Sequence, residues 1–416
     1  MVDVTYPPTV SGGLDWSRSP EWVFSFLVTG VGMLEVTEDN LRDEKSRRLY
    51  PQMAVTLPER LRAIRTQIRS VYLEPTKSPW VIGFSGGKDS TVLLQLVIEA
   101  IQSVSPDERR REVYVVCNDT LVESPVFQSY VIGTLDLVQQ GLEALGLPVR
   151  VVTTRPKVSE TFWVNLLGKG YPAPNRSFRW CTDRMKVRPT TEYIKSQIAA
   201  NGDVVLLLGI RRSESAERAK NIGRREAGSD GALLKPHDDL KGCFVYAPIV
   251  DLTTDDVWVA LVENRPPWGG RHNKLFEMYQ SAAEGECPFV LSDQEVASCG
   301  SGSARFGCWT CTVVEKDRSL DAMASSGFDQ LVPLAKYRTL LKETSEDPES
   351  RSKVRRNGQP GLGPLTLAAR EMLLQELLQT QDECGVELIS ADEIRLIREQ
   401  WEQDKYTSLL REISIA

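Results

Sequence analysis

Residues 85–90 combine the side chains and the backbone freedom that bind phosphate groups. They follow a short apolar run and precede a stretch rich in Val, Leu and Ile, so a buried strand should lead into the loop and a helix should leave it. Gly86 and Gly87 let the backbone approach an anion closely, and the hydroxyls of Ser85 and Ser90 can donate to it. The helix adds free N–H groups and the positive end of its dipole. The loop is therefore predicted to cradle a pyrophosphate.

Two charged residues of this loop indicate the kind of nucleotide chemistry that it serves. Lys88 can neutralise phosphate charge, and Asp89 suits the Mg²⁺ that accompanies ATP, because this ion prefers carboxylate and phosphate oxygens. A Walker A loop would need glycine where Ile82 stands and a hydroxyl residue in place of Asp89, so P-loop kinases and GTPases are excluded. The alternative is a tight strand-to-helix turn without a ligand, but the strand, loop and helix occur in the order that a phosphate loop requires.

Polar residues also follow two other predicted strands. Asp119 and Thr120 follow one strand, and Gly209, Arg211 and Arg212 follow another. Ligands of parallel sheets bind beyond the carboxyl ends of the strands, so these positions should lie near the phosphate loop. Guanidinium groups suit phosphate recognition and the stabilisation of charge in a nucleotidyl-transfer transition state.

A third basic segment contains Arg179 and Cys181. Arg179 is expected beside the phosphates with the other arginines. Positive charge near a thiol favours the thiolate, so Cys181 is a candidate reactive cysteine, and a buried packing role is the equal alternative. Ion pairing with Asp183, Glu214 and Glu217 is the alternative role of the arginines.

Half of the chain's cysteines crowd into one glycine-rich segment with the spacing C-x11-C-x8-C-x2-C. In a reducing compartment, such crowding indicates metal binding in preference to disulfides. Four thiolates fit zinc or an iron–sulfur cluster. Zinc ribbons generally use two C-x-x-C pairs and this segment has one, so a [4Fe–4S] cluster is favoured over zinc and over unrelated core cysteines. The predicted ligands are Cys287, Cys299, Cys308 and Cys311.

The elements that must position these residues alternate between apolar strands and helices. This alternation predicts βαβ units and an α/β fold, with a parallel sheet that has helices on both faces. A cysteine-rich iron–sulfur lobe and a helical C-terminal appendage should follow. The predicted strands are 80–84, 112–117, 149–153 and 204–208, and the predicted helices are 91–101, 126–145 and 190–199.

Composition and charge exclude several broad classes. The chain has 416 residues, of which 41% are hydrophobic and 26% charged, as in globular proteins. Its net charge of −7 argues against coating nucleic acid through the overall field, so such contact should be local or shared with a partner. Apolar stretches near the N-terminus fall short of the roughly 20 residues that span a bilayer, and the sequence there does not resemble a secretory signal. We therefore expect a cytoplasmic protein without membrane contact.

The phosphate loop resembles that of the PP-loop ATP pyrophosphatases, which include the 3′-phosphoadenylylsulfate (PAPS) reductases. Segments 178–186 and 209–215 resemble the PAPS reductase branch in particular. The cysteine segment, with 285–288 and 305–314 around its ligands, resembles the DndC/SspD-type sulfurtransferases of bacterial DNA phosphorothioation. The resemblance covers roughly residues 58–356.

This resemblance implies an enzyme that replaces a non-bridging oxygen of the DNA backbone with sulfur. ATP would adenylate the phosphate and release pyrophosphate, with Lys88, Asp89 and the arginines at the nucleotide. The implied cofactors are ATP, Mg²⁺ and a [4Fe–4S] cluster that relays sulfur, supplies electrons or holds the lobe in shape. The implied partners are DNA, a cysteine desulfurase as sulfur donor and other phosphorothioation-system proteins.

Changes in composition and motif divide the chain into five expected parts. The polar stretch 343–364, punctuated by Gly and Pro, is expected to be a linker. The other parts are an N-terminal arm (1–58), a PP-loop ATP pyrophosphatase domain (59–265), an iron–sulfur lobe (266–342) and the helical appendage (365–416).

Two rival functions remain open at this point. One is a PAPS/APS-type sulfonucleotide reductase, because Glu383-Cys384-Gly385 resembles the C-terminal cysteine motif of those enzymes. Val386 and Glu387 follow where that motif has a histidine, and a helix that ends at glycine explains the segment equally well. The other rival is a non-catalytic scaffold that binds nucleotide and DNA, and an intact phosphate loop argues against it.

Overall fold

The computed structural model describes residues 56–214, 232–282, 306–325 and 327–415, together with positions 220 and 223. The chain divides into two compact units, Met1–Thr56 and Leu57–Ala416, and the described residues belong to the second apart from Thr56. The predicted N-terminal arm, 1–58, therefore lies outside the described residues except for its last positions.

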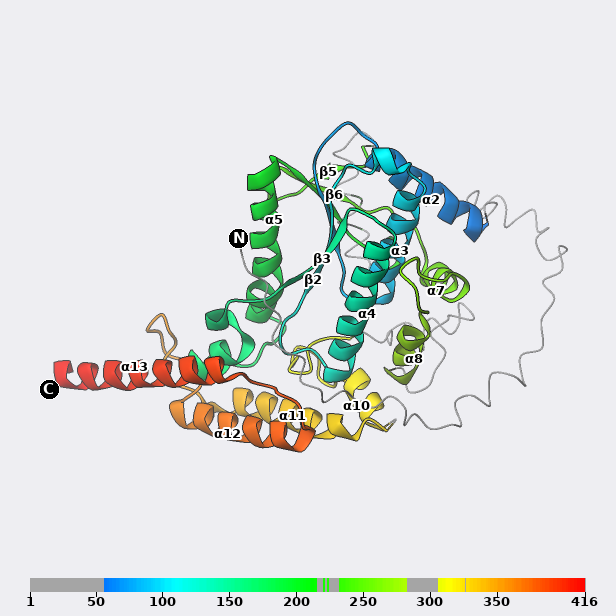
Figure 1. The fold of residues 1–416 in the computed structure, drawn as a ribbon. Helices are drawn as coiled ribbons and strands as arrows, with labels where there is room; N and C mark the ends of the chain where they lie inside the picture. Colours follow the sequence, from blue (N-terminus) through cyan, green and yellow to red (C-terminus); the bar gives the residue numbers. More distant parts are fainter. Residues whose placement is uncertain are drawn as a thin grey trace. The chain divides into compact units, whose positions relative to one another are not determined.

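Six strands form one sheet in the order β3-β2-β1-β4-β6-β5 (Figure 1). Neighbouring strands are parallel, except that β5 and β6 are antiparallel. The predicted α/β fold is confirmed, and the predicted strands lie within about a residue of the observed ones. The strands are β1 (Trp80–Gly83), β2 (Val113–Asn118), β3 (Val149–Thr154), β4 (Val204–Leu207), β5 (Lys235–Pro236) and β6 (Cys243–Tyr246).

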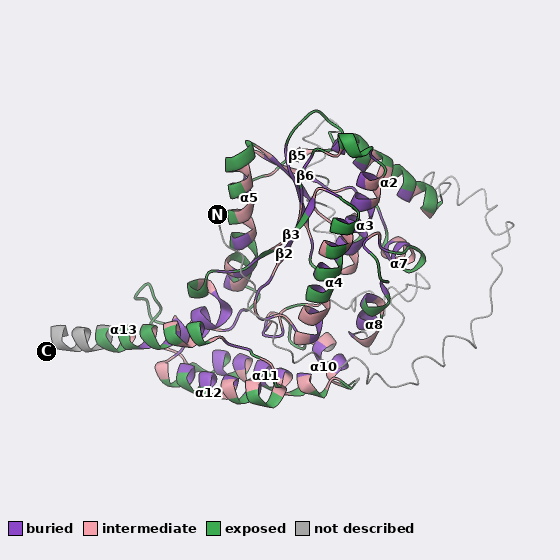
Figure 2. Cartoon of the chain, viewed as in Figure 1, coloured by how far each residue is buried: buried purple, intermediate pink, exposed green. Residues whose placement is uncertain are grey.

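Successive residues of β1 face opposite sides of the sheet and enter two separate cores. Trp80 and Ile82 belong to the larger core, whereas Val81 belongs to the smaller one. Figures 1 and 2 show helices on both faces, with purple buried positions turned toward the strands. The larger core contains residues of α2 (Leu57–Tyr72), α3 (Lys88–Gln102), α4 (Pro125–Ala144) and α7 (Thr254–Glu263), and the smaller core contains Ile194 of α5 (Arg188–Asn201).

The C-terminal region is helical, as predicted. Two indole N–H groups tie it to the π-helical turn Val164–Gly168 and the residue before it. Trp163 Nε1 donates to Leu388 O at 2.6 Å, and Trp401 Nε1 donates to Leu167 O at 2.7 Å. In the described ranges, no helix has both the length and the apolar character required to cross a bilayer. The helices are α8 (Asn273–Ala282), α10 (Arg318–Ser325), α11 (Val332–Glu346), α12 (Leu367–Cys384) and α13 (Ala391–Ile415).

Residues 343–364, expected to be a linker, contain regular structure. Helix α11 continues to Glu346, and β-bridges join Arg351 to Leu365 and Val354 to Pro360 in a hairpin. The Arg351 guanidinium donates to Gly363 O at 2.6 Å and to Ser345 O at 2.8 Å, so a charged side chain fixes the hairpin to the end of α11. The sequence did not predict the hairpin, because polar contacts hold it and it buries few apolar side chains.

Two glycines of α4 provide a matched test of the packing between the helix and the loop at Trp268. A Cβ added at Gly141 would lie 2.4 Å from Trp268 O, whereas one added at Gly133 would meet no atom within 4 Å. We expect Gly141→Ala to lower the free energy of unfolding by about 1–3 kcal/mol, because the backbone must shift. Gly133→Ala should leave it unchanged or raise it by up to about 1 kcal/mol. Urea unfolding of both variants checks this prediction, and equal stability of the two would contradict it.

Candidate active site

The candidate site lies at the carboxyl ends of three neighbouring strands. β1 pairs with β2 on one side and with β4 on the other, so the strand order reverses at β1. Ligands of open α/β sheets bind at such a reversal. The phosphate loop follows β1, Asp119 and Thr120 follow β2, and Gly209 to Arg212 follow β4. The fold therefore brings together the three polar segments that the sequence placed on separate strands.

The phosphate loop is held in shape by its own serines. Gly86 has φ +73°, in the left-handed region that favours glycine. Ser90 Oγ donates to Gly87 O at 3.0 Å, accepts from Ser85 N at 3.2 Å and lies 3.2 Å from Ser85 Oγ. The sequence predicted phosphate donors in Ser85 and Ser90, and in this structure the two hydroxyls contact each other. Helix α3 begins directly after the loop, at Lys88.

Asp89 is the most strongly connected charge of the loop. Arg211 Nε lies 2.6 Å from Asp89 Oδ1, and Lys88 Nζ lies 3.3 Å from Asp89 Oδ2. Arg211 is only 1% exposed and also donates to Ser213 Oγ at 2.8 Å and to Leu252 O at 3.3 Å. The buried Arg211 guanidinium is therefore fixed by these contacts and orients the Asp89 carboxylate.

The segment after β4 lies directly on the phosphate loop. A Cβ at Gly209 would come within 2.9 Å of Asp89 O, so only glycine permits this approach. Arg212 takes a different direction from Arg211, since its Nε donates to Asp251 Oδ1 at 2.7 Å and its side chain is 35% exposed. The two adjacent arginines thus have different environments, and the buried Arg211 contacts the phosphate loop through Asp89.

Tyr279 of α8 also contacts the phosphate loop, and sequence reasoning missed it. Lys88 N lies 3.5 Å from Tyr279 Oη, and Lys88 Nζ lies 5.3 Å from the centroid of the tyrosine ring. The ring of Phe306 packs edge-on against Tyr279, with centroids 4.9 Å apart. Helical spacing marks Tyr279 only as a core residue, because no sequence signal shows which loop it meets.

The turn after β2 carries backbone strain. Leu121 has φ +64°, a conformation that costs free energy in a residue with a branched side chain. Asp119 stabilises the turn, since its Oδ1 accepts from Leu121 N at 2.9 Å and its Oδ2 lies 3.0 Å from Arg155 Nε. Gln128 Nε2 also donates to Oδ1 at 3.4 Å, so the Asp119 carboxylate shapes the turn through three partners.

The residues after the strained turn contact the segment that contains the C-x-x-C pair. Trp309 N donates to Val122 O at 3.1 Å, and a β-bridge joins Glu123 to Cys308. Thr120 Oγ1 lies 3.5 Å from Cys308 Sγ. The tight turn between Cys308 and Cys311, which we call the cysteine knuckle (308–311), is closed by a 3.0 Å bond from Cys311 N to Cys308 O. The knuckle is thus bound to the end of β2, beside the strand that carries the phosphate loop.

Cys181 lies near the knuckle, a proximity that the sequence did not predict. Burial raises the pKa of the Cys181 thiol, and the neighbouring Cys308 and Cys311 add to this effect. The pKa of Lys186 is raised chiefly by Cys308. Burial thus works against a low pKa at Cys181, and its two predicted roles, reactive thiolate and packing residue, both stay predictions.

The predicted cluster ligands are described only in part. Cys287 and Cys299 lie outside the described residues, while Cys308 and Cys311 are free thiols. Within the described ranges, no three His, Cys, Asp or Glu side chains approach closely enough to hold a metal ion. The two described thiols are soft sulfur donors, which suit iron or zinc. Because only two of the four predicted ligands are described, the four-cysteine site stays a prediction.

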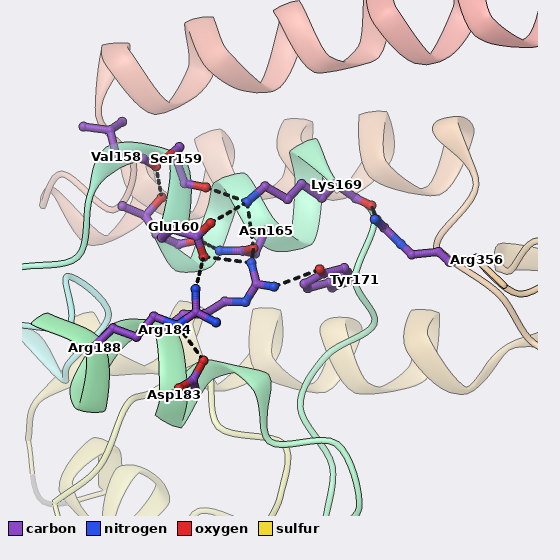
Figure 3. Close-up of polar contacts among 11 residues, drawn as sticks. Val158, Ser159, Glu160, Asn165, Lys169, Tyr171, Asp183, Arg184, Arg188 and Arg356 are labelled. Carbon is purple, nitrogen blue, oxygen red and sulfur yellow. Dashed lines mark hydrogen bonds and ion pairs between the residues drawn. The ribbon is translucent and has the colours of Figure 1, made fainter. Parts of the chain in front are cut away.

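The segment that contains Arg179 and Cys181 is anchored through Arg184 (Figure 3). Arg184 Nη1 lies 2.8 Å from Glu160 Oε2 and 2.6 Å from Asn165 Oδ1, and Arg184 Nη2 donates to Tyr171 Oη at 3.0 Å. Arg179 itself is exposed. The contacts of Arg184 thus hold the segment in place from inside, while Arg179 lies at the surface.

Comparison with known proteins supports a family for the greater part of the chain. Residues 79–314 match the phosphoadenosine phosphosulfate reductase domain family. The uncharacterized protein MJ0066 of Methanocaldococcus jannaschii is 28% identical over 250 residues, which are 60% of this chain and 39% of that protein. MJ0973 of the same organism is 27% identical over 194 residues, or 47% of this chain and 38% of that protein. The chain thus spans about two fifths of the length of these relatives.

Similar solved structures include a reductase and a tRNA thiolase. PAPS reductase from Candida auris, in a phosphate complex, gives a TM-score of 0.31 at 16% identity and covers 56% of this chain and 89% of its own. The U34-tRNA thiolase NcsA from Methanococcus maripaludis, with its [4Fe-4S] cluster, gives a TM-score of 0.34 at 14% identity. That match covers 77% of this chain and 89% of the thiolase chain. Scores this low carry no weight by themselves.

The position of Tyr279 yields a test of the phosphate loop. Its hydroxyl oxygen lies 3.5 Å from Lys88 N, a donor that we expect to bind a phosphate oxygen of the ligand. Tyr279→Phe removes that oxygen and keeps the ring, so we expect inorganic pyrophosphate to bind about threefold to tenfold more tightly. Isothermal titration calorimetry measures this, with Tyr406→Phe on exposed α13 as the control. Weaker binding by the Tyr279 variant would show that the hydroxyl serves the ligand and would contradict the prediction.

Proposed function

We propose, because this chain belongs to the phosphoadenosine phosphosulfate reductase domain family, that it is a PP-loop ATP pyrophosphatase that activates a DNA backbone phosphate for sulfur insertion. The single observation that carries the nucleotide part is the Arg211–Asp89 ion pair at the phosphate loop. The DNA part is supported by the resemblance of the cysteine segment to DndC/SspD-type sulfurtransferases. ATP turnover at this loop and sulfur chemistry at the cysteines are both consistent with the family.

The first step joins the DNA phosphate to AMP. A non-bridging oxygen of the phosphodiester attacks the α-phosphorus of ATP, the bond to the bridging oxygen between the α and β phosphates breaks, and pyrophosphate leaves. The second step is attack of sulfur on the DNA phosphorus, which expels AMP with the original oxygen. Sulfide completes this step without redox change, whereas a persulfide also needs a thiol to break its S–S bond and a reductant to restore that thiol.

The residues of the loop have distinct tasks in the first step. Arg211 fixes Asp89 through Oδ1. Lys88 contacts Oδ2 at the longer distance of 3.3 Å, so it can turn to the phosphates and leave that oxygen for Mg²⁺. Gly86 and Gly87 allow the pyrophosphate to approach the backbone. Positioning and charge stabilisation are the main means by which proteins catalyse such transfers.

The cysteine knuckle is the proposed holder of the iron–sulfur cluster, with Cys287 and Cys299 as the further ligands. A bound cluster would supply a site for sulfur or electrons beside the phosphate being modified. Cys308 contacts Thr120 and forms a β-bridge with Glu123, and these contacts position the knuckle at the carboxyl end of β2. A cysteine desulfurase and other phosphorothioation proteins are the proposed partners, with a cytoplasmic location.

A sulfonucleotide reductase is the second candidate, since the family to which the chain belongs takes its name from such an enzyme. Such an enzyme would need a reactive C-terminal thiol. Cys384 closes α12 before Gly385, whose φ of +67° ends the helix. Burial raises the pKa of Cys384 to about 11, so its thiol is protonated at neutral pH. The local structure thus favours a helix end over a nucleophile.

Pyrophosphate release tests the proposal directly. With DNA, a cysteine desulfurase and cysteine present, the chain should convert ATP to AMP and pyrophosphate. Asp89→Asn should lower this rate on the order of 100-fold, because the Mg²⁺ ligand and the partner of Arg211 lose their charge. Asp107→Asn, an exposed change on the same domain, should leave the rate unchanged.

Three results would contradict the proposal. They are ADP as the product, ATP turnover that does not depend on Asp89, and sulfite release from PAPS without any need for DNA. The last result would favour the reductase.

A further inference from the structure

Two segments that are distant in sequence meet at Tyr171. The guanidinium of Arg356, in the 351–365 hairpin, lies 4.6 Å from the centroid of the Tyr171 ring, and Arg184 lies 4.9 Å from it. Phe178 lies 6.0 Å from the same ring. Figure 3 shows Arg356 and Arg184 approaching Tyr171 from separate parts of the chain. The hairpin and the loop 171–179 thus meet at the Tyr171 ring.

The outer arginines of this surface are not neutralised. Lys169 and Arg184, beneath it, pair with Glu160 at 3.1 and 2.8 Å. By contrast, four exposed arginines have no carboxylate within ion-pair distance in the described part of the chain. Together with the exposed Phe178 they define what we call the arginine face: Arg176, Arg179, Arg355 and Arg356.

The arginine face is built on a rigid base. Phe178 N donates to Asn175 Oδ1 at 2.9 Å, and Ala173 N donates to Ser345 Oγ at 2.9 Å, so the loop is fixed both internally and to α11. In the hairpin, Arg355 N donates to Gln359 O at 2.8 Å. A surface that is already ordered loses little conformational entropy when it binds a ligand.

The composition of the face matches single-stranded or locally opened nucleic acid. Phe178 is 42% exposed and lies between arginines, and bases stack on such aromatic rings while guanidinium groups contact phosphates. The chain as a whole has a net charge of −7, so this concentration of unpaired positive charge is local. An acidic chain that presents such a face fits a polyanionic ligand at this surface.

The face also leads to the cysteine knuckle. Thr312, next to Cys311, donates through Oγ1 to Pro174 O at 2.5 Å, in the same loop as Arg176. Arg179 precedes Cys181 by two residues. The loop that carries Arg176 and Arg179 is therefore joined directly to the segment that follows the cysteine knuckle.

We propose that the arginine face binds the DNA backbone and guides a phosphate to the cysteine knuckle. This inference rests on the proposed function, which makes DNA the acceptor. The contacts are with phosphates and base faces, so binding should depend strongly on salt and weakly on base sequence.

The test uses the full chain and a fluorescein-labelled single-stranded DNA oligonucleotide in an anisotropy titration. The double variant Arg176→Glu/Arg355→Glu should bind at least about tenfold more weakly. Its slope of log K against log salt should be smaller by about 1.4, because two phosphate contacts to single-stranded DNA are lost. The control Arg395→Glu/Lys405→Glu changes charge equally on α13, where both side chains are exposed, and should bind as the parent does. Circular dichroism confirms that all three proteins are folded.

Several results would overturn the arginine face. They are equal binding by the double variant and the parent, equal losses in the double variant and the control, absence of DNA binding by the parent at low salt, and competition by polyglutamate as effective as by DNA. Pyrophosphate release is measured separately. If the parent releases no pyrophosphate, the proposed function is wrong, but the DNA-binding result can still be interpreted. If the parent releases pyrophosphate and the double variant binds DNA as the parent does, only the proposal about the arginine face is wrong.

Discussion

The buried ion pair between Arg211 and Asp89 is the interaction on which the rest of the site depends. It joins the loop after β1 to the segment after β4, two strands that pair side by side. Arg211 is almost fully buried, so loss of either partner would leave an uncompensated charge, which typically costs several kcal/mol. Gly209 permits the close approach that the pair requires. The position of the phosphate loop is thus determined by two strand ends and one salt bridge.

A second constraint connects this loop to the cysteines. The left-handed backbone of Leu121 turns the chain after β2 so that Val122 and Glu123 offer their backbone groups to the knuckle. Phe306, which precedes Cys308, packs against Tyr279 at the phosphate loop. The phosphate loop and the cysteine knuckle therefore lie at neighbouring strand ends. Such proximity suits a reaction in which one phosphate is first adenylated and then attacked by sulfur.

The sequence predicted elements whose signal is local. Apolar runs marked four strands, and glycine and cysteine spacing marked residues 85–90 and the C-x-x-C pair as candidate site segments, because such patterns are visible along the chain. The contact of Tyr279 with Lys88 and the approach of Cys181 to Cys308 depend on how distant segments pack, so no local pattern contains them. The hairpin 351–365 was missed because its stability comes from side-chain bonds of Arg351. The domain boundaries and the complete set of cluster ligands stay predictions.

The proposed reaction begins when a DNA phosphate oxygen attacks the α-phosphorus of ATP at the loop held by Arg211 and Asp89. Its most direct test uses DNA whose non-bridging phosphate oxygens are labelled with oxygen-18, incubated with the chain, ATP, a cysteine desulfurase and cysteine. Mass spectrometry of the nucleotide products should find the label in AMP and none in pyrophosphate, because AMP departs with the oxygen that sulfur replaces. Unlabelled AMP formed while sulfur enters the DNA would contradict the claim.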